Sequence, residues 1–127
     1  MPKILVVDGD DSSRDILKMQ LEGTGATVLE LGSGEEVLQT AKTTHPDLIF
    51  LDVMMPQVNG WKICQLLKAD SETSRIPVMM LTAGVQQSDE LRSWESGADG
   101  YLTKSREPER VIREVREFLP SQAGNLA

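Results

Sequence analysis

Residues 47–60 read Asp-Leu-Ile-Phe-Leu-Asp-Val-Met-Met-Pro-Gln-Val-Asn-Gly, and this stretch decides the fold. The apolar run at 48–51 is typical of a strand that is buried on both faces of a parallel sheet. Asp52 follows directly, and Pro56 and the Asn59-Gly60 pair prevent the strand from continuing. Ligands of open parallel sheets bind at the carboxyl ends of the strands. Asp52 is therefore the first candidate for chemistry, and a turn-forming or helix-capping aspartate is the alternative.

Strand and helix patterns alternate along the whole chain. Apolar runs predict strands at residues 4–7, 27–30, 48–51, 76–81 and 99–103. Apolar residues at helical spacing predict helices that begin near Ser12, Ser33, Trp61, Gln86 and Pro108. Ser33 and Glu36 have the spacing of a capping box, which favours a helix start at that point. Strict alternation of this kind predicts an α/β domain, in which helices cover both faces of a doubly wound parallel sheet.

For five strands the natural arrangement is the flavodoxin-like (βα)5 sheet with strand order 2-1-3-4-5. This order makes the first and third strands neighbours, so that Asp8 and Asp10 should lie beside Asp52. Thr82 and Lys104 follow the fourth and fifth strands and should reach the same edge. We therefore expect acids, a hydroxyl and a cation to share one solvent-open pocket.

Composition limits the classes of function. The 127 residues, of which 39% are hydrophobic, suffice for one domain, which we place at residues 1–119 with a tail or linker at 120–127. The net charge is −7 and there is no basic run, which argues against direct binding of nucleic acid. The single cysteine, Cys64, excludes an internal disulfide. The sequence contains no signal peptide or membrane-spanning run, so we expect a cytoplasmic protein without membrane contact.

Five motifs in order resemble the receiver domains of two-component response regulators, including the chemotaxis regulators. The resemblance spans residues 2–119 and combines motifs that would be weak alone. The motifs are Asp8 after its strand, Asp52-Val-Met-Met-Pro56 with Asn59-Gly60, Leu81-Thr82-Ala83, Gly97-Ala-Asp-Gly-Tyr101, and Lys104.

The resemblance implies a phosphorylation site. Asp52 would be the phosphoacceptor, a carboxylate nucleophile that forms a mixed anhydride with phosphate. A magnesium ion would neutralise the incoming charge. Its implied ligands are Asp8, Asp52, the backbone carbonyl of Met54 and, as a replacement acid, Asp10. The implied residues for phosphate binding and switching are Thr82, Ala83, Lys104 and Tyr101.

The resemblance also implies partners. A sensor histidine kinase or a phosphotransfer protein would supply the phosphoryl group, as in a phosphorelay. The surface formed by helix 4, strand 5 and helix 5 would signal to an effector protein or to a missing output domain. Such a domain removes its own phosphate and is not a turnover enzyme. A weak homodimer is also possible through a charged face that includes Arg92, Asp99, Arg113 and Arg116.

Two departures from the family pattern leave alternatives open. Gly9 stands where the family usually has a second acid, so magnesium binding is expected to be weaker. Ser105 stands where a cis-proline usually follows the lysine, so we expect a trans peptide. The first alternative is a degenerate receiver that binds proteins without phosphate. The second is a haloacid-dehalogenase-like phosphatase, because Asp8-Gly9-Asp10-Asp11-Ser12 fits the Asp-x-Asp-x-Ser/Thr motif, with Asp8 as nucleophile.

Overall fold

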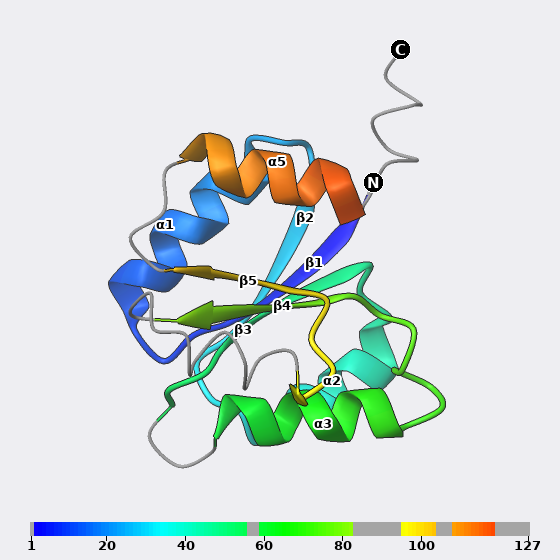
Figure 1. The fold of residues 1–127 in the computed structure, drawn as a ribbon. Helices are drawn as coiled ribbons and strands as arrows, with labels where there is room; N and C mark the ends of the chain where they lie inside the picture. The colour runs from blue at the N-terminus through cyan, green and yellow to red at the C-terminus, as the bar shows by residue number, and fades with distance from the viewer. Residues whose placement is uncertain (1, 56–58, 83–94, 104–107, 119–127) are drawn as a thin grey trace.

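A single parallel sheet forms the centre of the molecule (Figure 1). The computed structural model describes residues 2–55, 59–82, 95–103 and 108–118. The sheet has five strands in the order β2-β1-β3-β4-β5, which confirms the predicted flavodoxin-like topology. The strands are β1 (Lys3–Val7), β2 (Thr27–Leu31), β3 (Leu48–Asp52), β4 (Val78–Thr82) and β5 (Gly100–Thr103).

Helices cover both faces of the sheet (Figure 1). The described helices are α1 (Asp11–Glu22), α2 (Val37–Thr44), α3 (Gly60–Ala69) and α5 (Pro108–Phe118). Figure 1 shows α1 and α5 on one face, and α2 and α3 on the other. The helix predicted at 86–95 lies outside the described residues except for Glu95. None of the described helices has the length and apolar character needed to cross a membrane.

The core is split into two layers by the alternation of side chains along each strand. In β1, Ile4 and Val6 join the cluster under α1 and α5, whereas Leu5 and Val7 join the cluster under α2 and α3. All five residues of β3 are buried, as the continuous apolar run predicts. Burying each such aliphatic or aromatic side chain contributes about 1.5–3 kcal/mol, and β1, β3 and β4 each contribute four of them.

The start of α2 differs from the prediction. Glu36 occupies the N-cap without a side-chain hydrogen bond, and the helix begins at Val37. The Ser33 hydroxyl oxygen instead accepts a hydrogen bond from the Glu35 amide at 3.3 Å. The capping-box prediction was wrong because this serine closes a local turn ahead of the helix. The start of α1 is also slightly earlier than predicted, since Asp10 is its N-cap.

Candidate functional site

Three predicted site residues lie at one edge of the sheet, where β1, β3 and β4 end. Val7 pairs with Leu51, so that Asp8 and Asp52 are the next residues on neighbouring strands. Asp52 in turn pairs with Leu81, and Thr82 is the last residue of β4. The arrangement follows from the strand order and brings together two carboxylates and one hydroxyl.

The backbone that follows Asp52 is held by short-range contacts. The Met54 amide donates to the Asp52 Oδ1 atom at 3.1 Å. Gly60, the first residue of α3, donates through its amide to the Val53 carbonyl oxygen at 3.1 Å. The Asn59 side chain caps α3 by accepting from the Trp61 amide at 2.8 Å. The Asn59-Gly60 pair therefore also joins the start of α3 to the backbone that follows Asp52.

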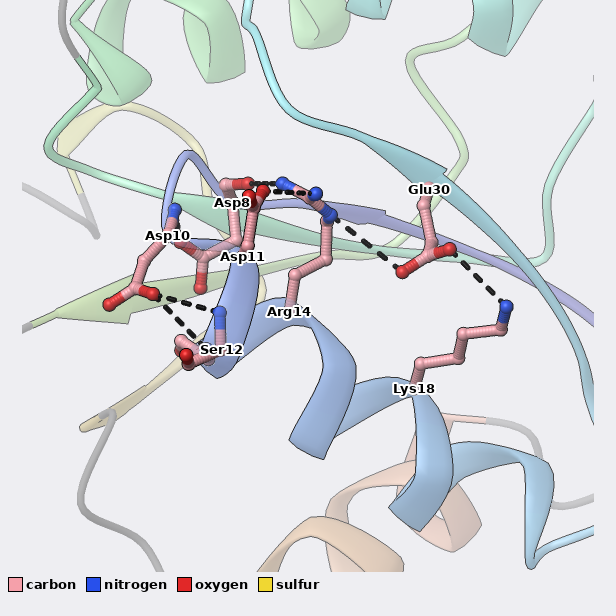
Figure 2. A network of polar contacts seen from close by, with 8 residues as sticks. Asp8, Asp10, Asp11, Ser12, Arg14, Lys18 and Glu30 are labelled. Atoms are coloured by element: carbon pink, nitrogen blue, oxygen red, sulfur yellow. Dashed lines mark hydrogen bonds and ion pairs between the residues drawn. The ribbon is translucent and has the colours of Figure 1, made fainter.

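The loop after β1 is organised around Asp8 and Asp10 (Figure 2). The Asp10 amide donates to Asp8 Oδ1 at 2.9 Å. Asp10 Oδ1 accepts hydrogen bonds from the Ser12 amide at 3.0 Å and from the Ser13 amide at 3.4 Å, which caps α1. Arg14 Nη1 donates to the Asp8 carbonyl oxygen at 2.7 Å. Asp8 is thus held both through its side chain and through its backbone.

Burial at the site is greater than the sequence predicts. Asp8 has no exposed surface, Asp52 is 2% exposed and Thr82 is 0% exposed, so the expected solvent-open pocket is not found at these residues. Asp52, the last residue of β3, pairs with Leu81 in the sheet, and the first residue of α3, Gly60, lies against the Asp52 backbone. The Met54 side chain, two residues farther on, is 69% exposed.

The donor chemistry fits a hard divalent cation. Asp8 and Asp52 supply carboxylate oxygens, and buried carboxylates on neighbouring strands favour a cation between them. Gly9 adds no side-chain oxygen, and one Asp10 oxygen already accepts two amide hydrogen bonds. Within residues 2–55, 59–82, 95–103 and 108–118, no group of three or more His, Cys, Asp or Glu side chains could hold a metal. Two carboxylates and backbone oxygen therefore form the donor set that fits magnesium.

Two further predicted residues, Ala83 and Lys104, lie outside the described residues, as do Ser105 and Arg92. Tyr101 lies in β5, half-buried, and packs against the core layer under α2 and α3.

Asp99, which the sequence places on a dimer face, is engaged within the chain. Its Oδ2 atom accepts from Lys68 Nζ and from the Val78 amide, each at 2.8 Å. These contacts lie where β4 begins, at the edge of the sheet opposite Asp8 and Asp52. The homodimer stays a prediction. Of the arginines assigned to its interface, the structure describes Arg113 and Arg116, and both are exposed on α5.

Cys64, Asp70 and Lys42, which lie outside the acidic edge, have shifted pKa values. Burial raises the pKa of the Cys64 thiol, which keeps it protonated and unreactive at neutral pH. The hydrogen bond with Lys42 lowers the pKa of Asp70, and the same contact raises the pKa of Lys42. Lys42 Nζ lies 2.8 Å from Asp70 Oδ2 and links the last turn of α2 to the residue after α3.

Sequence reasoning missed two contributors to the site. Arg14 contacts the Asp8 backbone, and its position three residues after Asp11 was the available signal for an ion pair. Gly60 was interpreted as a strand breaker and as part of a family motif, whereas the structure shows it packed against the Asp52 backbone. No pattern in the sequence reveals that close approach.

Comparisons with known proteins agree with this geometry. DNA-binding dual master transcriptional regulator RpaA from a Synechocystis strain is 41% identical over 119 residues, which cover 94% of this chain and 49% of that protein. Alkaline phosphatase synthesis transcriptional regulatory protein PhoP from Bacillus subtilis is 40% identical over 117 residues, or 92% of this chain and 48% of PhoP. The chain thus spans about half the length of these curated relatives.

Solved structures match over nearly their whole length. A putative response regulator from Chloroflexus aurantiacus has a TM-score of 0.90 at 34% identity, with 94% of this chain and 99% of that chain covered. Chemotaxis protein CheY4 from Vibrio cholerae has a TM-score of 0.87 at 28% identity, with the same coverage. The family model of the response regulator receiver domain matches residues 4–116. The sheet order, the acidic edge and these matches agree, and the chain belongs to the receiver domain family of two-component response regulators.

Proposed function

We propose that this chain is a phosphoacceptor receiver domain in which Asp52 takes up the phosphoryl group. The observation that carries the proposal is that two buried carboxylates, Asp8 and Asp52, stand at adjacent strand ends, with Thr82 at the end of the next strand. Structural carboxylates are rarely gathered in this way without a cation or a reaction, because burying their charge is costly. The topological switch point is also where such sheets bind ligands.

The proposed reaction transfers a phosphoryl group between two acceptors. A carboxylate oxygen of Asp52 attacks phosphorus of a phosphohistidine, the P–N bond breaks, and its electron pair leaves with the imidazole, which takes up a proton. The product is an acyl phosphate on Asp52. Water later attacks phosphorus, which releases inorganic phosphate and restores the carboxylate. This self-limiting cycle is not the turnover of an enzyme.

Asp8, Asp52 and the Met54 carbonyl are the proposed holders of a magnesium ion, with Asp10 as a further candidate. Bound at this edge, magnesium would offset the negative charge of the phosphoryl oxygens. Because Gly9 supplies no side-chain oxygen, the site is expected to be weaker than one with a third carboxylate. Asp10 can add an oxygen only through the carboxylate that also caps α1.

Phosphorylation acts in this proposal by shifting a population of conformations. The phosphoryl group adds nearly two negative charges and new acceptors at the edge of the sheet. It biases the domain only as far as it binds the active arrangement better than the inactive one. Thr82 with Ala83 and Lys104 would contact the phosphoryl oxygens, and Tyr101 would change rotamer. The surface of helix 4, strand 5 and helix 5 would then be read by a partner.

The proposed donors are a sensor histidine kinase or a phosphotransfer protein. The proposed recipient is an effector protein or an output domain. The output domain draws support from the curated relatives, which are about twice as long and carry names of transcriptional regulators. We also retain as proposals a cytoplasmic location, a domain boundary near residue 119, and a weak homodimer.

Intact-mass analysis after incubation with acetyl phosphate and magnesium tests the proposal. We expect one phosphoryl adduct on the unchanged chain and none on Asp52→Asn. Asp47→Asn is the matched control, because Asp47 precedes the same strand and its Oδ2 accepts from the Lys3 amide at 2.8 Å. An adduct that persists in Asp52→Asn would contradict the assignment of the nucleophile.

A phosphate-independent binding module is the second candidate, and two observations favour it: Gly9 in the acidic loop and the 2% exposure of Asp52. It predicts no adduct at high acetyl phosphate and no magnesium binding by calorimetry. The phosphatase interpretation loses its support because a receiver model matches residues 4–116. Turnover of a phosphomonoester that Asp8→Asn abolishes, and Asp52→Asn does not, would restore it.

A further inference from the structure

The side chain of Arg14 reaches from the second turn of α1 to the backbone at the acidic edge. Figure 2 shows its guanidinium group pointing toward Asp8 and Asp11. Nη1 donates to the Asp8 carbonyl oxygen at 2.7 Å. The side chain is only 17% exposed. A partly buried, charge-assisted hydrogen bond to a backbone carbonyl is a strong constraint on the loop.

The same guanidinium group is held from two other directions (Figure 2). Nη2 forms a hydrogen-bonded ion pair with Asp11, and Nε lies 3.7 Å from Glu30 Oε1 on β2. The other Glu30 oxygen lies 3.3 Å from Lys18 Nζ. The Asp11 side chain is 85% exposed, so that pair contributes little by itself. The contact that distinguishes Arg14 from an ordinary surface cation is the one to Asp8.

Asp8 needs such an anchor because of the residue that follows it. Gly9 lacks a side chain and places few restrictions on the backbone. Asp8 is fixed on one side by its amide, which donates to the Leu31 carbonyl oxygen at 3.1 Å. Its carboxylate accepts the Asp10 amide, which belongs to the same short loop. Arg14 adds a constraint that ties the Asp8 carbonyl directly to α1.

We propose that Arg14 is a positioning residue, which sets the orientation of the Asp8 carboxylate for a divalent cation by holding the Asp8 carbonyl. The inference rests on the proposed function, since it concerns the same cation. Arg14 acts through Asp8 and touches neither the cation nor the phosphoryl group. Its planar fork can bind the Asp8 carbonyl and Asp11 together, which a lysine ammonium cannot do.

Magnesium titration of the full chain by calorimetry tests this role. Loss of a residue that orients a metal ligand commonly weakens metal affinity about 10–100-fold, and we expect about tenfold for Arg14→Lys. Arg14→Gln should weaken binding as well. The direction of the affinity change in Arg14→Gln distinguishes the two roles. A purely electrostatic role predicts tighter magnesium binding, because this variant removes the positive charge. Lys42→Ala is the control at the opposite edge and should leave the affinity unchanged.

A second readout separates positioning from simple loss of stability. In folded Arg14→Lys, the magnesium concentration at half-maximal rate of phosphorylation by acetyl phosphate should rise about tenfold, as the affinity falls. The rate at saturating magnesium should return to that of the unchanged chain. Amide exchange followed by NMR should also be faster at Asp10, whose amide donates to Asp8 Oδ1 in the structure.

The outcomes distinguish the two proposals. Normal phosphorylation of the unchanged chain, together with unchanged or tighter magnesium binding in Arg14→Gln, overturns the positioning role and leaves the proposed function standing. A chain with its natural Arg14 that neither binds magnesium nor takes up phosphate overturns the proposed function, and this inference with it. Equal loss of affinity in Lys42→Ala would also overturn the inference, because the effect would then not be specific to the acidic edge.

Discussion

Gly60 lies so close to Asp52 that an added Cβ atom would stand 2.2 Å from the Asp52 carbonyl oxygen. The same atom would lie 2.7 Å from the Cα of Val53. Both neighbours are backbone atoms, which cannot rotate away as the end of a long side chain can. The first turn of α3 therefore fixes the backbone that carries the proposed phosphoacceptor.

Replacement of Gly60 by alanine should force β3 and α3 apart. We expect Gly60→Ala to lower the free energy of unfolding by about 1–3 kcal/mol, as overpacked sites commonly do. Urea denaturation measures this change. Gly23→Ala is the matched control, because its added Cβ would meet nothing closer than 3.4 Å and its φ is −62°. Equal stability of the two variants would contradict the close approach.

An acid at position 9, where the family usually has one, should strengthen the proposed cation site. Gly25 and Gly97 are the described glycines with positive φ, so the φ of Gly9 is one that an aspartate can adopt. A third carboxylate adds charge and a hard oxygen donor, and we expect Gly9→Asp to tighten magnesium binding about tenfold. Calorimetry measures the affinity, with Gly9→Asn as the uncharged control. Weaker binding in Gly9→Asp would show that the added acid does not reach the cation.

Two substitutions of Asp10 distinguish its role as the N-cap of α1 from its proposed role as a magnesium ligand. Asp10→Ala removes the acceptor for the Ser12 and Ser13 amides and should cost about 1 kcal/mol of stability. Asp10→Asn keeps a capping oxygen and should preserve the unfolding midpoint in urea. If Asp10 serves only as a cap, magnesium affinity in Asp10→Asn stays near that of the unchanged chain. A large loss of affinity in this variant would assign Asp10 to the cation.

Glu114 makes stability depend on pH. Burial and the nearby Glu117 carboxylate raise the pKa of Glu114 above its ordinary value of 4.5. The folded chain thus holds this proton more tightly than the unfolded chain, so the ionised group destabilises the fold at neutral pH. The penalty disappears as the pH falls through the raised pKa. Glu114→Gln should raise the free energy of unfolding at pH 7, by no more than about 1 kcal/mol for a partly solvated group.

Urea denaturation at several pH values measures the Glu114 effect. The advantage of Glu114→Gln should shrink with falling pH and vanish below 4.5, where the carboxyl group is protonated in both states. Glu117→Gln is a second variant, because removal of the like charge should lower the pKa of Glu114. An advantage that is independent of pH would show that side-chain packing, and not charge, is responsible.

The sheet and its acidic edge could be predicted because they follow from periodicity and strand order. The unbroken apolar run before Asp52 indicated a strand buried on both faces, and the alternation of elements placed Asp8 beside it. The contacts that finish the site could not be predicted in this way. The bond from Arg14 to the Asp8 carbonyl depends on the direction of a long side chain, and the fit of Gly60 depends on a distance between backbones.

Local capping was harder to predict than topology. Ser33 and Glu36 had suitable spacing for a capping box, but the serine used its hydroxyl for a turn. Asp10, in contrast, serves as a cap although the sequence first suggests a ligand. In both cases one polar side chain had several backbone partners of similar energy within reach, and sequence spacing does not choose among them.

The ion pairs Lys42–Asp70 and Lys68–Asp99 brace the edge of the sheet opposite Asp8 and Asp52. These two ion pairs therefore lie at the end of the strands away from the proposed phosphorylation site. Substitutions at these ion pairs can change stability without contact with Asp52, whereas substitutions near Asp52 would change the lifetime of the proposed acyl phosphate. Under the proposed function, the lifetime of the phosphorylated state can then evolve without change at either ion pair.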